Sequence, residues 1–258
     1  MGKIPTVVIS LTFAETRRAV MHEQLSRLKV PYAFFDAVVG AELSKQQIAQ
    51  LKPRRIERLN RDTWLVGELG NSASNKAVLE RIVSGRDDFV CVLEDDAILS
   101  DAFADFLDDQ NVRRLPPFDV LRLNGSWVGR YLPISSFGGF QIVAPYRMGP
   151  FSCGQIFTRK AAKAILRGYA PMRGPFDLAL YMDRRYPFLK ILDVMPDVVK
   201  HDDRTSFVEI DIPRMSPEQK SVFDKMRKRI FRAGCDFRAA ISFMALWGLR
   251  SRKKLPYR

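Results

Sequence analysis

This sequence has few of the residues that build disulfide frameworks and zinc sites. Its three cysteines, Cys91, Cys153 and Cys235, are far apart, odd in number and outside any CxxC arrangement. It also has only two histidines, of which His201 is the only one beyond the first predicted helix. We therefore expect neither a disulfide framework nor a structural zinc site, which suits a reducing cytosol.

Long apolar segments are missing as well. The uncharged run Ala239–Leu249 has 11 residues, whereas about 20 are needed to span a bilayer. The N-terminus leads directly into a predicted strand, without the apolar core and cleavage site of a signal peptide. No internal repeat or low-complexity segment occurs in the 258 residues. We expect a cytoplasmic protein with one large domain, or one domain plus an appendage.

The positive charge of the chain is concentrated at its C-terminal end. Between Lys225 and Arg258 there are 11 Lys or Arg residues and one acid, so this stretch contributes +10 to a net charge of +13. The apolar residues there recur at helical spacing: Ile230, Phe237, Ile241 and Met244, joined by Phe243, Leu246 and Trp247. We expect a basic amphipathic helix that lies on an anionic membrane surface. The alternative is a helix packed on the domain with its basic face in water.

The order of the predicted elements indicates an α/β fold with a mostly parallel central sheet. Strands are predicted at residues 6–11, 31–38, 89–93, 118–124, 152–158 and 188–194. Helices are predicted after Thr12 or Thr16 and at residues 44–51, 67–84, 101–107 and 159–166, with Thr158 as the cap of the last. Residues 125–150 fit hairpins or an acceptor loop.

The most informative stretch is an apolar run, residues 89–93, that leads directly into Glu94-Asp95-Asp96. Such a run predicts a buried central strand, and acids at its end lie where open α/β sheets bind ligands. These like charges repel one another and have no Lys or Arg within three residues downstream. A divalent cation would compensate them, and carboxylate oxygens suit Mg²⁺ or Mn²⁺. Strand alternation places Glu94 and Asp96 on one face and Asp95 on the other. The alternative is a solvated acidic loop.

Three further features are candidates for chemistry. Arg17-Arg18 fall in the early turns of the first helix, where they could meet a phosphate or form a solvated basic face. Asp177 lies at the start of a predicted helix, where an acid is often only a cap. His201 could supply an imidazole ligand beside a carboxylate metal site.

Five short motifs occur in an order that resembles glycosyltransferase family 25. They are Ile9-Ser10-Leu11 with Arg17-Arg18, Phe34-Phe35-Asp36-Ala37-Val38-x-Gly40, Gly67-Glu68-Leu69-Gly70-x-Ser72-Ala73-Ser74, Leu93-Glu94-Asp95-Asp96 and Pro175-x-Asp177. The family comprises lipopolysaccharide and lipooligosaccharide glycosyltransferases, some of which are galactosyltransferases. The resemblance covers roughly residues 4–210 and leaves the tail outside.

The resemblance implies a GT-A-like nucleotide-sugar-binding domain at residues 1–215, followed by the basic tail at 216–258. It implies metal-dependent, inverting transfer of a sugar, with galactose as one candidate, from a UDP-sugar. The acceptor would be a hydroxyl of a lipid-linked lipopolysaccharide or lipooligosaccharide core. We expect the enzyme to lie on the inner face of the cytoplasmic membrane, with no nucleic-acid partner.

The resemblance also implies roles for individual residues. Asp96 is the first candidate for direct contact with Mn²⁺ or Mg²⁺, with Glu94 and His201 as further ligands. Asp177 is the candidate base for the acceptor hydroxyl, and Asp183 is the reserve. The candidates for contact with the nucleotide sugar are Ser10, Leu11, Arg18, Asp36, Glu68, Ser74, Glu94 and Asp95.

One departure from the family pattern stands in the small-residue motif. The family usually has Gly-Cys and then Ser-His there, whereas this chain has Asn71 and Asn75. An asparagine cannot act as an acid or base near neutral pH, so the task of that histidine is not carried over. A member that has lost catalysis is therefore one alternative, and a metal-dependent phosphohydrolase is another, although the latter would need more metal ligands than this chain offers.

Overall fold

The computed structural model describes residues 2–51, 65–125, 129–149, 153–169, 175–182, 185–202, 222–248 and 253–254. Within them a nine-stranded sheet has the order β11-β6-β7-β9-β5-β8-β3-β1-β2. The strands are β1 Thr6–Ser10, β2 Tyr32–Asp36, β3 Phe89–Glu94, β5 Val120–Arg122, β6 Arg130–Phe137, β7 Phe140–Pro145, β8 Gly154–Thr158, β9 Ile191–Met195 and β11 Lys253–Lys254. A separate two-stranded sheet pairs β4 Ala97–Leu99 with β10 Val199–His201.

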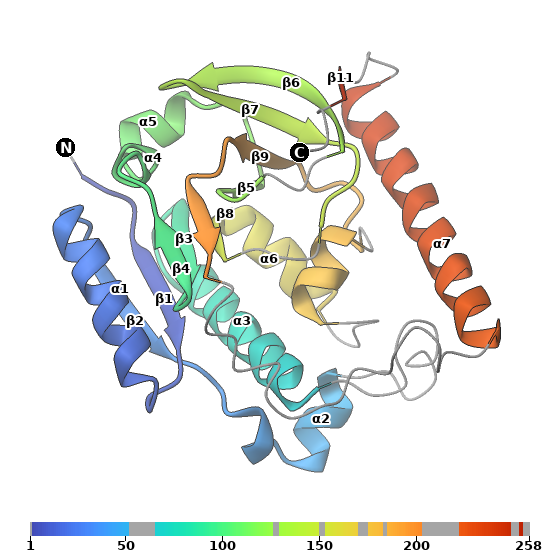
Figure 1. Ribbon diagram of the computed structural model, residues 1–258, viewed down its shortest axis with the longest axis horizontal. Helices are drawn as coiled ribbons and strands as arrows, with labels where there is room; N and C mark the ends of the chain where they lie inside the picture. The colour runs from blue at the N-terminus through green and yellow to red at the C-terminus, as the bar shows by residue number, and fades with distance from the viewer. Residues whose placement is uncertain are drawn as a thin grey trace.

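Most strands of the large sheet point the same way. β1, β2 and β3 are parallel, and β5 and β9 form a second parallel pair. β8 lies between these groups and runs antiparallel to both β3 and β5. The edge at β7, β6 and β11 is antiparallel. The predicted α/β class with a mostly parallel central sheet is thus confirmed, with β8 as an insertion of opposite direction (Figure 1).

Helices cover both faces of the sheet because alternate strand residues point to opposite sides. They are α1 Glu15–Arg27, α2 Lys45–Leu51, α3 Val66–Ser84, α4 Phe103–Phe106, α5 Asp109–Arg114 and α6 Arg159–Arg167, with the short segments η1 Gly40–Glu42 and η3 Leu178–Met182. One core lies on the side of α1 and α4 and includes Val8, Cys91 and Leu93. The other lies on the side of α3 and α6 and includes Val92 and Phe157. The strand side chains alternate between the two cores, as a doubly covered sheet requires.

Local details differ from the sequence prediction in three places. The first helix begins at Glu15 after Ala14, which makes no side-chain cap, so the predicted Thr12 or Thr16 cap is wrong. The short strand β4 follows the acidic triplet directly, and the helix α5 was not predicted. The Thr158 cap is confirmed, because its hydroxyl accepts a 3.0 Å hydrogen bond from the backbone N–H of Ala161.

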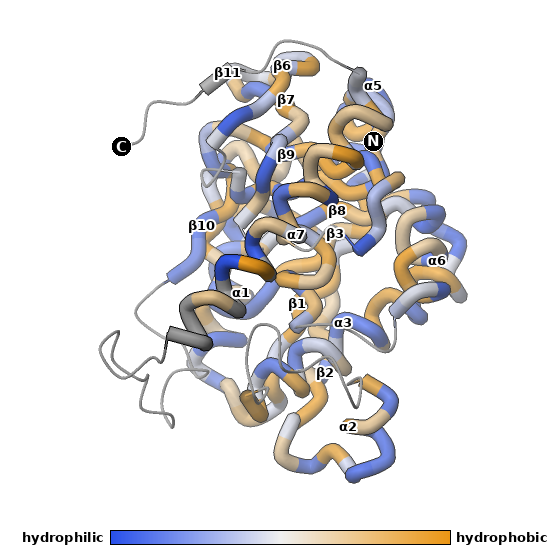
Figure 2. Tube along the Cα trace, turned by 90° about the vertical axis from the view of Figure 1, so that its right-hand side faces the viewer, coloured by the Kyte–Doolittle hydropathy of each residue, from blue (hydrophilic) through white to orange (hydrophobic). Residues whose placement is uncertain are grey.

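The C-terminal helix α7 Val222–Trp247 packs against the domain. The Phe243 side chain is buried in the core and contacts the ring of Tyr146. The Ser242 hydroxyl donates a 2.6 Å hydrogen bond to the carbonyl of Pro187. Along α7, hydrophobic and hydrophilic residues alternate in the tube of Figure 2. The predicted helical tail is confirmed, while the predicted boundary at residue 215 lies outside the described residues.

A buried ion pair lies at the centre of the sheet. The Arg122 and Asp193 side chains have no exposed surface, and their Nε and Oδ1 atoms are 3.1 Å apart. Arg122 also donates to the Gly149 carbonyl and lies over the Tyr181 ring. Removal of either partner would break an ion pair in the interior, so this pair fixes how β5 and β9 are joined near their carboxyl ends.

Two glycines let the loop after β2 pack on the start of α3. A Cβ atom on Gly40 would lie 1.9 Å from the Val66 carbonyl oxygen, and one on Gly70 would lie 2.6 Å from the Val38 carbonyl oxygen. Ser74 reinforces the contact by accepting a 2.8 Å hydrogen bond from the Val38 backbone N–H. The two glycines therefore allow the backbone of the loop after β2 to contact the backbone at the start of α3.

We expect Gly70→Ala to destabilise the protein by about 1–3 kcal/mol, the usual cost of forcing atoms into a packed contact. Denaturant unfolding measures the loss. The matched control is Gly234→Ala inside α7, where the new Cβ would be 3.4 Å from the nearest atom, on the flexible Arg238 side chain. A helix interior gains roughly 0.5–1 kcal/mol from this change. Equal stabilities for the two variants would contradict the packing argument.

Candidate active site

The acidic triplet begins at the carboxyl end of β3, and its middle residue points toward the first strand and helix. Asp95 accepts a 2.7 Å hydrogen bond from the Ser10 hydroxyl at the end of β1. It also accepts a 2.9 Å bond from Arg17 on α1. The Arg17 guanidinium additionally lies 3.8 Å from Asp96. Arg17 therefore compensates part of the acidic charge, which the sequence prediction had left to a cation alone.

Asp96 is held by the small sheet beside the main one. The β4–β10 register places His201 opposite Ala97, and the backbone N–H of Asp202 donates to the Asp96 carbonyl. His201 Nε2 consequently lies 3.2 Å from Asp96 Oδ2. The other carboxylate oxygen, Oδ1, is buried and has no hydrogen-bond partner among the described residues. A buried oxygen without a donor or cation is unusual, so this atom is a candidate ligand position.

Glu94 points the other way, toward α3. Its Oε1 accepts a 2.9 Å hydrogen bond from the Asn71 side chain. Asn75, one helical turn later, donates to both the carbonyl and the side-chain oxygen of Asn71 at 3.0 Å. The two asparagines that depart from the family pattern thus form a series of hydrogen bonds that holds the Glu94 side chain in place. Asp95 and Glu94 contact different elements, as the predicted strand alternation requires. β3 ends at Glu94, however, and Asp96 lies in the following turn near Arg17 and His201, so the alternation that placed it with Glu94 does not extend to Asp96.

The surroundings of Glu94 favour its protonated form. The pKa of Glu94 is raised to about 8, mainly by burial and next by the negative charge of Asp96, with a smaller contribution from Asp177. The hydrogen bond from Asn71 and the charge of His201 act in the opposite direction. A carboxyl group whose neighbours are two more carboxylates is a site that a cation would stabilise.

Asp177 approaches the triplet from a distant part of the sequence. The backbone N–H of Phe176 donates a 3.2 Å hydrogen bond to the Ser72 hydroxyl on α3, which fixes this segment beside Asn71. Asp177 Oδ1 accepts a 2.8 Å bond from the Leu178 N–H. The charge of Asp177 is close enough to raise the Glu94 pKa. The reserve candidate, Asp183, lies outside the described residues.

Arg18 orders the end of the first parallel pair. Its guanidinium donates to the carbonyls of Ser10 and Leu11 at 2.9 and 3.1 Å. It also pairs with Asp36 at the end of β2, at 2.5 Å, and lies over the Phe34 ring. The Asp36 side chain is 68% exposed. Four residues that were predicted to contact the nucleotide sugar thus lie at the same edge of the sheet as the triplet: Ser10, Leu11, Arg18 and Asp36.

Two other predicted contacts have structural partners in α3. Glu68 Oε2 accepts a 3.0 Å hydrogen bond from the Leu65 backbone N–H and so closes the start of the helix. Ser74 has no exposed surface, and its hydroxyl also donates to the Gly70 carbonyl at 2.7 Å. Ser74 therefore joins α3 to the loop after β2.

The donor set can be tested against a divalent cation. Among the described residues, no group of three or more His, Cys, Asp or Glu side chains is arranged to hold a metal ion. Mg²⁺, however, usually keeps several waters and binds one or two carboxylates together with the phosphates of a substrate. The unpartnered Asp96 Oδ1 and the repelled Glu94 carboxyl fit that second arrangement.

Comparison with known proteins now decides the family. The sequence profile of glycosyltransferase family 25 (LPS biosynthesis protein) matches residues 3–135. The match spans β1, Arg17, α3 and the whole acidic triplet. The chain belongs to glycosyltransferase family 25. It is accordingly a glycosyltransferase of the lipopolysaccharide-biosynthesis family, as the motif series predicted.

Two individual proteins are similar to this family 25 chain. One is the lacto-N-neotetraose biosynthesis glycosyltransferase LgtB of Neisseria meningitidis serogroup B, 27% identical over 190 residues, which are 68% of this chain and 67% of LgtB. The other is a glycosyltransferase involved in the glycosylation of the major capsid of PBCV-1, which is known from a crystal structure. It has a TM-score of 0.42 and 10% identity, and covers 90% of this chain and 100% of that one.

Sequence reasoning missed several residues that build this family 25 site. Arg17 was noted only as a possible phosphate contact, although it binds the triplet. Asn71 was noted only as a departure, and Ser72 was given no role. The i, i+4 spacing of Asn71 and Asn75 places them on one helix face, and that signal could have indicated a shared partner.

The raised pKa of Glu94 predicts a dependence of stability on pH. The folded state keeps the Glu94 proton up to about pH 8, whereas an unfolded chain loses it near pH 4.3. The unfolded state therefore binds fewer protons in this window, and stability falls as pH rises, by up to about 1.4 kcal/mol per pH unit. We expect Glu94→Gln to flatten this decline in metal-free protein, measured by unfolding between pH 5 and 8. Parallel pH profiles for variant and wild type would contradict the assignment.

Proposed function

We propose that this enzyme moves a sugar, with galactose as one candidate, from a UDP-sugar to a hydroxyl of a lipopolysaccharide or lipooligosaccharide core, with inversion and with the help of Mn²⁺ or Mg²⁺. The observation that carries the proposal is that the carboxyl groups of Glu94, Asp96 and Asp177 lie close enough to interact at the carboxyl end of β3. That edge of an open α/β sheet is where nucleotides bind.

In this proposal one carboxylate acts as the base and two others would hold the cation. Asp177 removes the proton from the acceptor hydroxyl, whose oxygen forms the new bond to the anomeric carbon. The bond from that carbon to the diphosphate breaks at the same time, and its electron pair leaves with UDP. A cation held by Asp96 and Glu94 would supply Lewis-acid stabilisation of the leaving diphosphate. Asn71 keeps Glu94 in place for this role. His201 lies 3.2 Å from the Asp96 carboxylate and is the third candidate ligand.

A binding panel tests the proposal. Thermal unfolding is measured with UDP-, GDP- and CMP-sugars, each with and without Mn²⁺. We expect stabilisation by the UDP class, increased by Mn²⁺, because a ligand that binds only the folded state raises its stability. Stabilisation by another nucleotide class would indicate that the donor is a sugar of that nucleotide and not a UDP-sugar. No stabilisation by any of them would favour a member that has lost catalysis.

We further propose that α7 holds the enzyme on an anionic membrane surface, beside a lipid-linked acceptor. No helix within the described residues is long and apolar enough to cross a bilayer. The buried positions of α7, Cys235, Ala239, Ser242 and Phe243, share one face. A second apolar stripe faces solvent: Met226, Ile230, Phe237, Ile241 and Met244.

The exposed stripe supports an interfacial role. Its Ile230 and Phe237 side chains are 58% and 66% exposed, and helical periodicity places Arg229 and Arg238 on its two flanks. A helix with one face on the domain and an apolar, cation-flanked face in solvent suits the boundary between headgroups and acyl chains. The alternative, a helix packed on the domain with its basic face in water, does not account for this stripe.

We expect Phe237→Ser combined with Ile241→Ser to weaken binding to anionic vesicles at least tenfold, since each buried apolar side chain contributes about 1.5–3 kcal/mol. Cosedimentation measures the binding, and added salt should weaken it in the wild type. The matched control is Phe13→Ser, because Phe13 is 63% exposed outside α7. Both changed residues are exposed, so the fold should persist, whereas truncation would remove Phe243 from the core. Undiminished vesicle binding by the double variant would refute the role of α7.

A further inference from the structure

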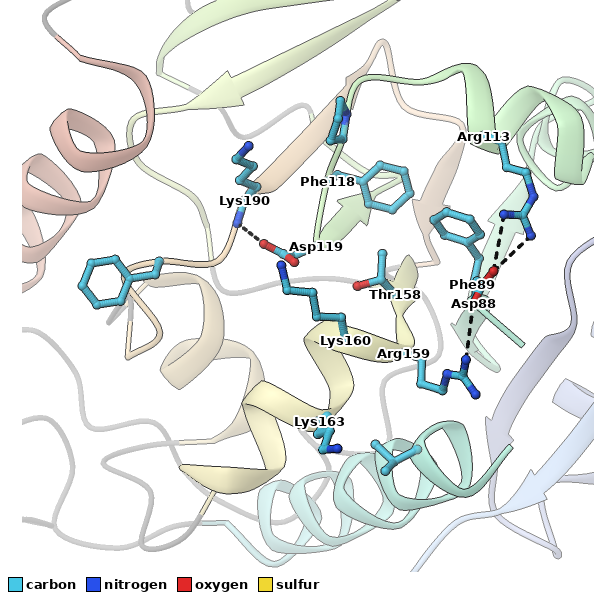
Figure 3. A pocket seen from close by; sticks show the side chains of 13 residues that line it. Asp88, Phe89, Arg113, Phe118, Asp119, Thr158, Arg159, Lys160, Lys163 and Lys190 are labelled. Atoms are coloured by element: carbon cyan, nitrogen blue, oxygen red, sulfur yellow. Dashed lines mark hydrogen bonds and ion pairs between the residues drawn. The ribbon is translucent and has the colours of Figure 1, made fainter. Parts of the chain in front are cut away.

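A cavity in the described part of the molecule lies away from the acidic site, at the opposite ends of the strands. It has a volume of about 770 Å³ and is bordered by the starts of β3, β5 and β9 and by the first turns of α6 (Figure 3). Phe89 borders this cavity, and Glu94 ends the same strand five residues later. At about 3.3 Å per residue, roughly 16 Å separates the two sites. The cavity is therefore distinct from the transfer site.

Five cationic side chains line this cleft: Arg113, Arg159, Lys160, Lys163 and Lys190. Its acids are Asp88 and Asp119, so the lining carries three more positive than negative charges. Asp88 pairs with Arg113 and Arg159 at 3.3 and 3.4 Å. Asp119 accepts a hydrogen bond from the Lys190 backbone N–H.

The three lysines have no such compensation. Among the described residues, none of the Lys160, Lys163 and Lys190 ammonium groups makes an ion pair or hydrogen bond with a carboxylate. Lys160 and Lys163 are three residues apart on α6, where like charges repel. Lys160 also lies in the first turn, which contains no acid and where the helix dipole disfavours cations. A bound anion would relieve all of these unfavourable terms.

The shape and lining indicate what the anion is attached to. The volume falls in the usual range for small-molecule sites, about 300–1,000 Å³. Phe188 lies on the rim and is 77% exposed. An exposed aromatic ring beside a group of ammonium donors offers an apolar face next to a phosphate-binding point. We propose that this cleft is a second binding site, for a phosphate-bearing saccharide.

Calorimetric titration of the full chain tests the site. The probes are glucose 6-phosphate and glucose, at equal ionic strength. We expect binding of glucose 6-phosphate alone, and at least a tenfold loss of affinity in the Lys160→Gln/Lys163→Gln double variant, since hydrogen bonds between charged groups are stronger than those between neutral ones. Both lysines are exposed on α6, so the change should leave stability intact. The matched control is Lys45→Gln, an exposed lysine of α2 far from the cleft.

Vesicles of phosphatidylglycerol and of phosphatidylcholine distinguish a soluble phosphate from a lipid one. If glucose 6-phosphate binds and depends on the two lysines, the site takes a soluble phosphosaccharide. If only phosphatidylglycerol vesicles bind in a manner that depends on the same lysines, the phosphate is carried by a lipid and the saccharide assignment fails. The proposal is also overturned if neither probe binds, if glucose binds as well as its phosphate, or if the double variant behaves like the wild type.

Discussion

Replacement of Asp96 by asparagine is expected to lower sugar transfer by at least about 10²-fold, the scale seen when a group that stabilises developing charge is removed. The assay follows release of UDP from the donor in the presence of a lipooligosaccharide core preparation. In the same variant, Mn²⁺ should no longer strengthen the binding of UDP, measured by calorimetry.

The reason lies in the two oxygens of this carboxylate. Oδ2 has His201 at 3.2 Å, whereas Oδ1 is buried without a partner among the described residues. Asparagine keeps the size of the side chain and one oxygen, but it loses the negative charge that a cation needs. Because Asp96 raises the pKa of Glu94 by repulsion, its neutralisation should leave the metal-free protein as stable as before, or more stable.

Two further variants make this result specific. Asp101→Asn neutralises an exposed acid that pairs with Arg27 on the surface, and should leave transfer unchanged. Asp95→Asn should instead destabilise the fold, because Arg17 is only 13% exposed and would lose its 2.9 Å ion pair with this carboxylate. Full transfer by Asp96→Asn would remove Asp96 from the chemistry. Unfolding of that variant without metal would show that its role is structural.

Much of the fold could be predicted from local patterns. The apolar run of β3 ending in acids marks a central strand and the edge of the sheet at which the site lies. The helix α6 follows from its Thr158 cap, and α7 follows from the spacing of its apolar residues. Each of these signals is contained within a few neighbouring residues, and periodicity or capping chemistry is sufficient to recognise it.

The contacts that complete the site are not local. Arg17 reaches Asp95 across 78 residues, and Phe176 reaches Ser72 across 104. Neither pairing leaves a pattern in a single sequence, because both depend on which strands become neighbours in the sheet. The β4–β10 pair that places His201 against Asp96 is too short to give a periodic signal. The basic cleft is likewise assembled from three strand starts and α6.

Replacement of Asp177 by asparagine is expected to reduce the turnover rate by about 10²–10⁴-fold, the usual contribution of a general base. The affinity for the UDP-sugar should stay within a few-fold, since the donor does not require this proton acceptor. Asparagine retains Oδ1, which accepts from the Leu178 N–H at 2.8 Å, and it caps helices about as well as aspartate. The fold is therefore preserved, and the rate reports on the lost base alone.

Ser72→Ala distinguishes the contribution of the base itself from that of the hydrogen bond that positions it. The Ser72 hydroxyl accepts the 3.2 Å hydrogen bond from Phe176 N–H that places Asp177 beside Glu94. Loss of this hydrogen bond should lower turnover by a smaller factor than Asp177→Asn does. The double variant should be no slower than Asp177→Asn, because the position of residue 177 no longer affects the rate once its base has been removed. An unchanged rate in Asp177→Asn would assign Asp177 to the helix start and move the base to Asp183. Equal and independent losses in the two single variants would show that Ser72 acts through another residue.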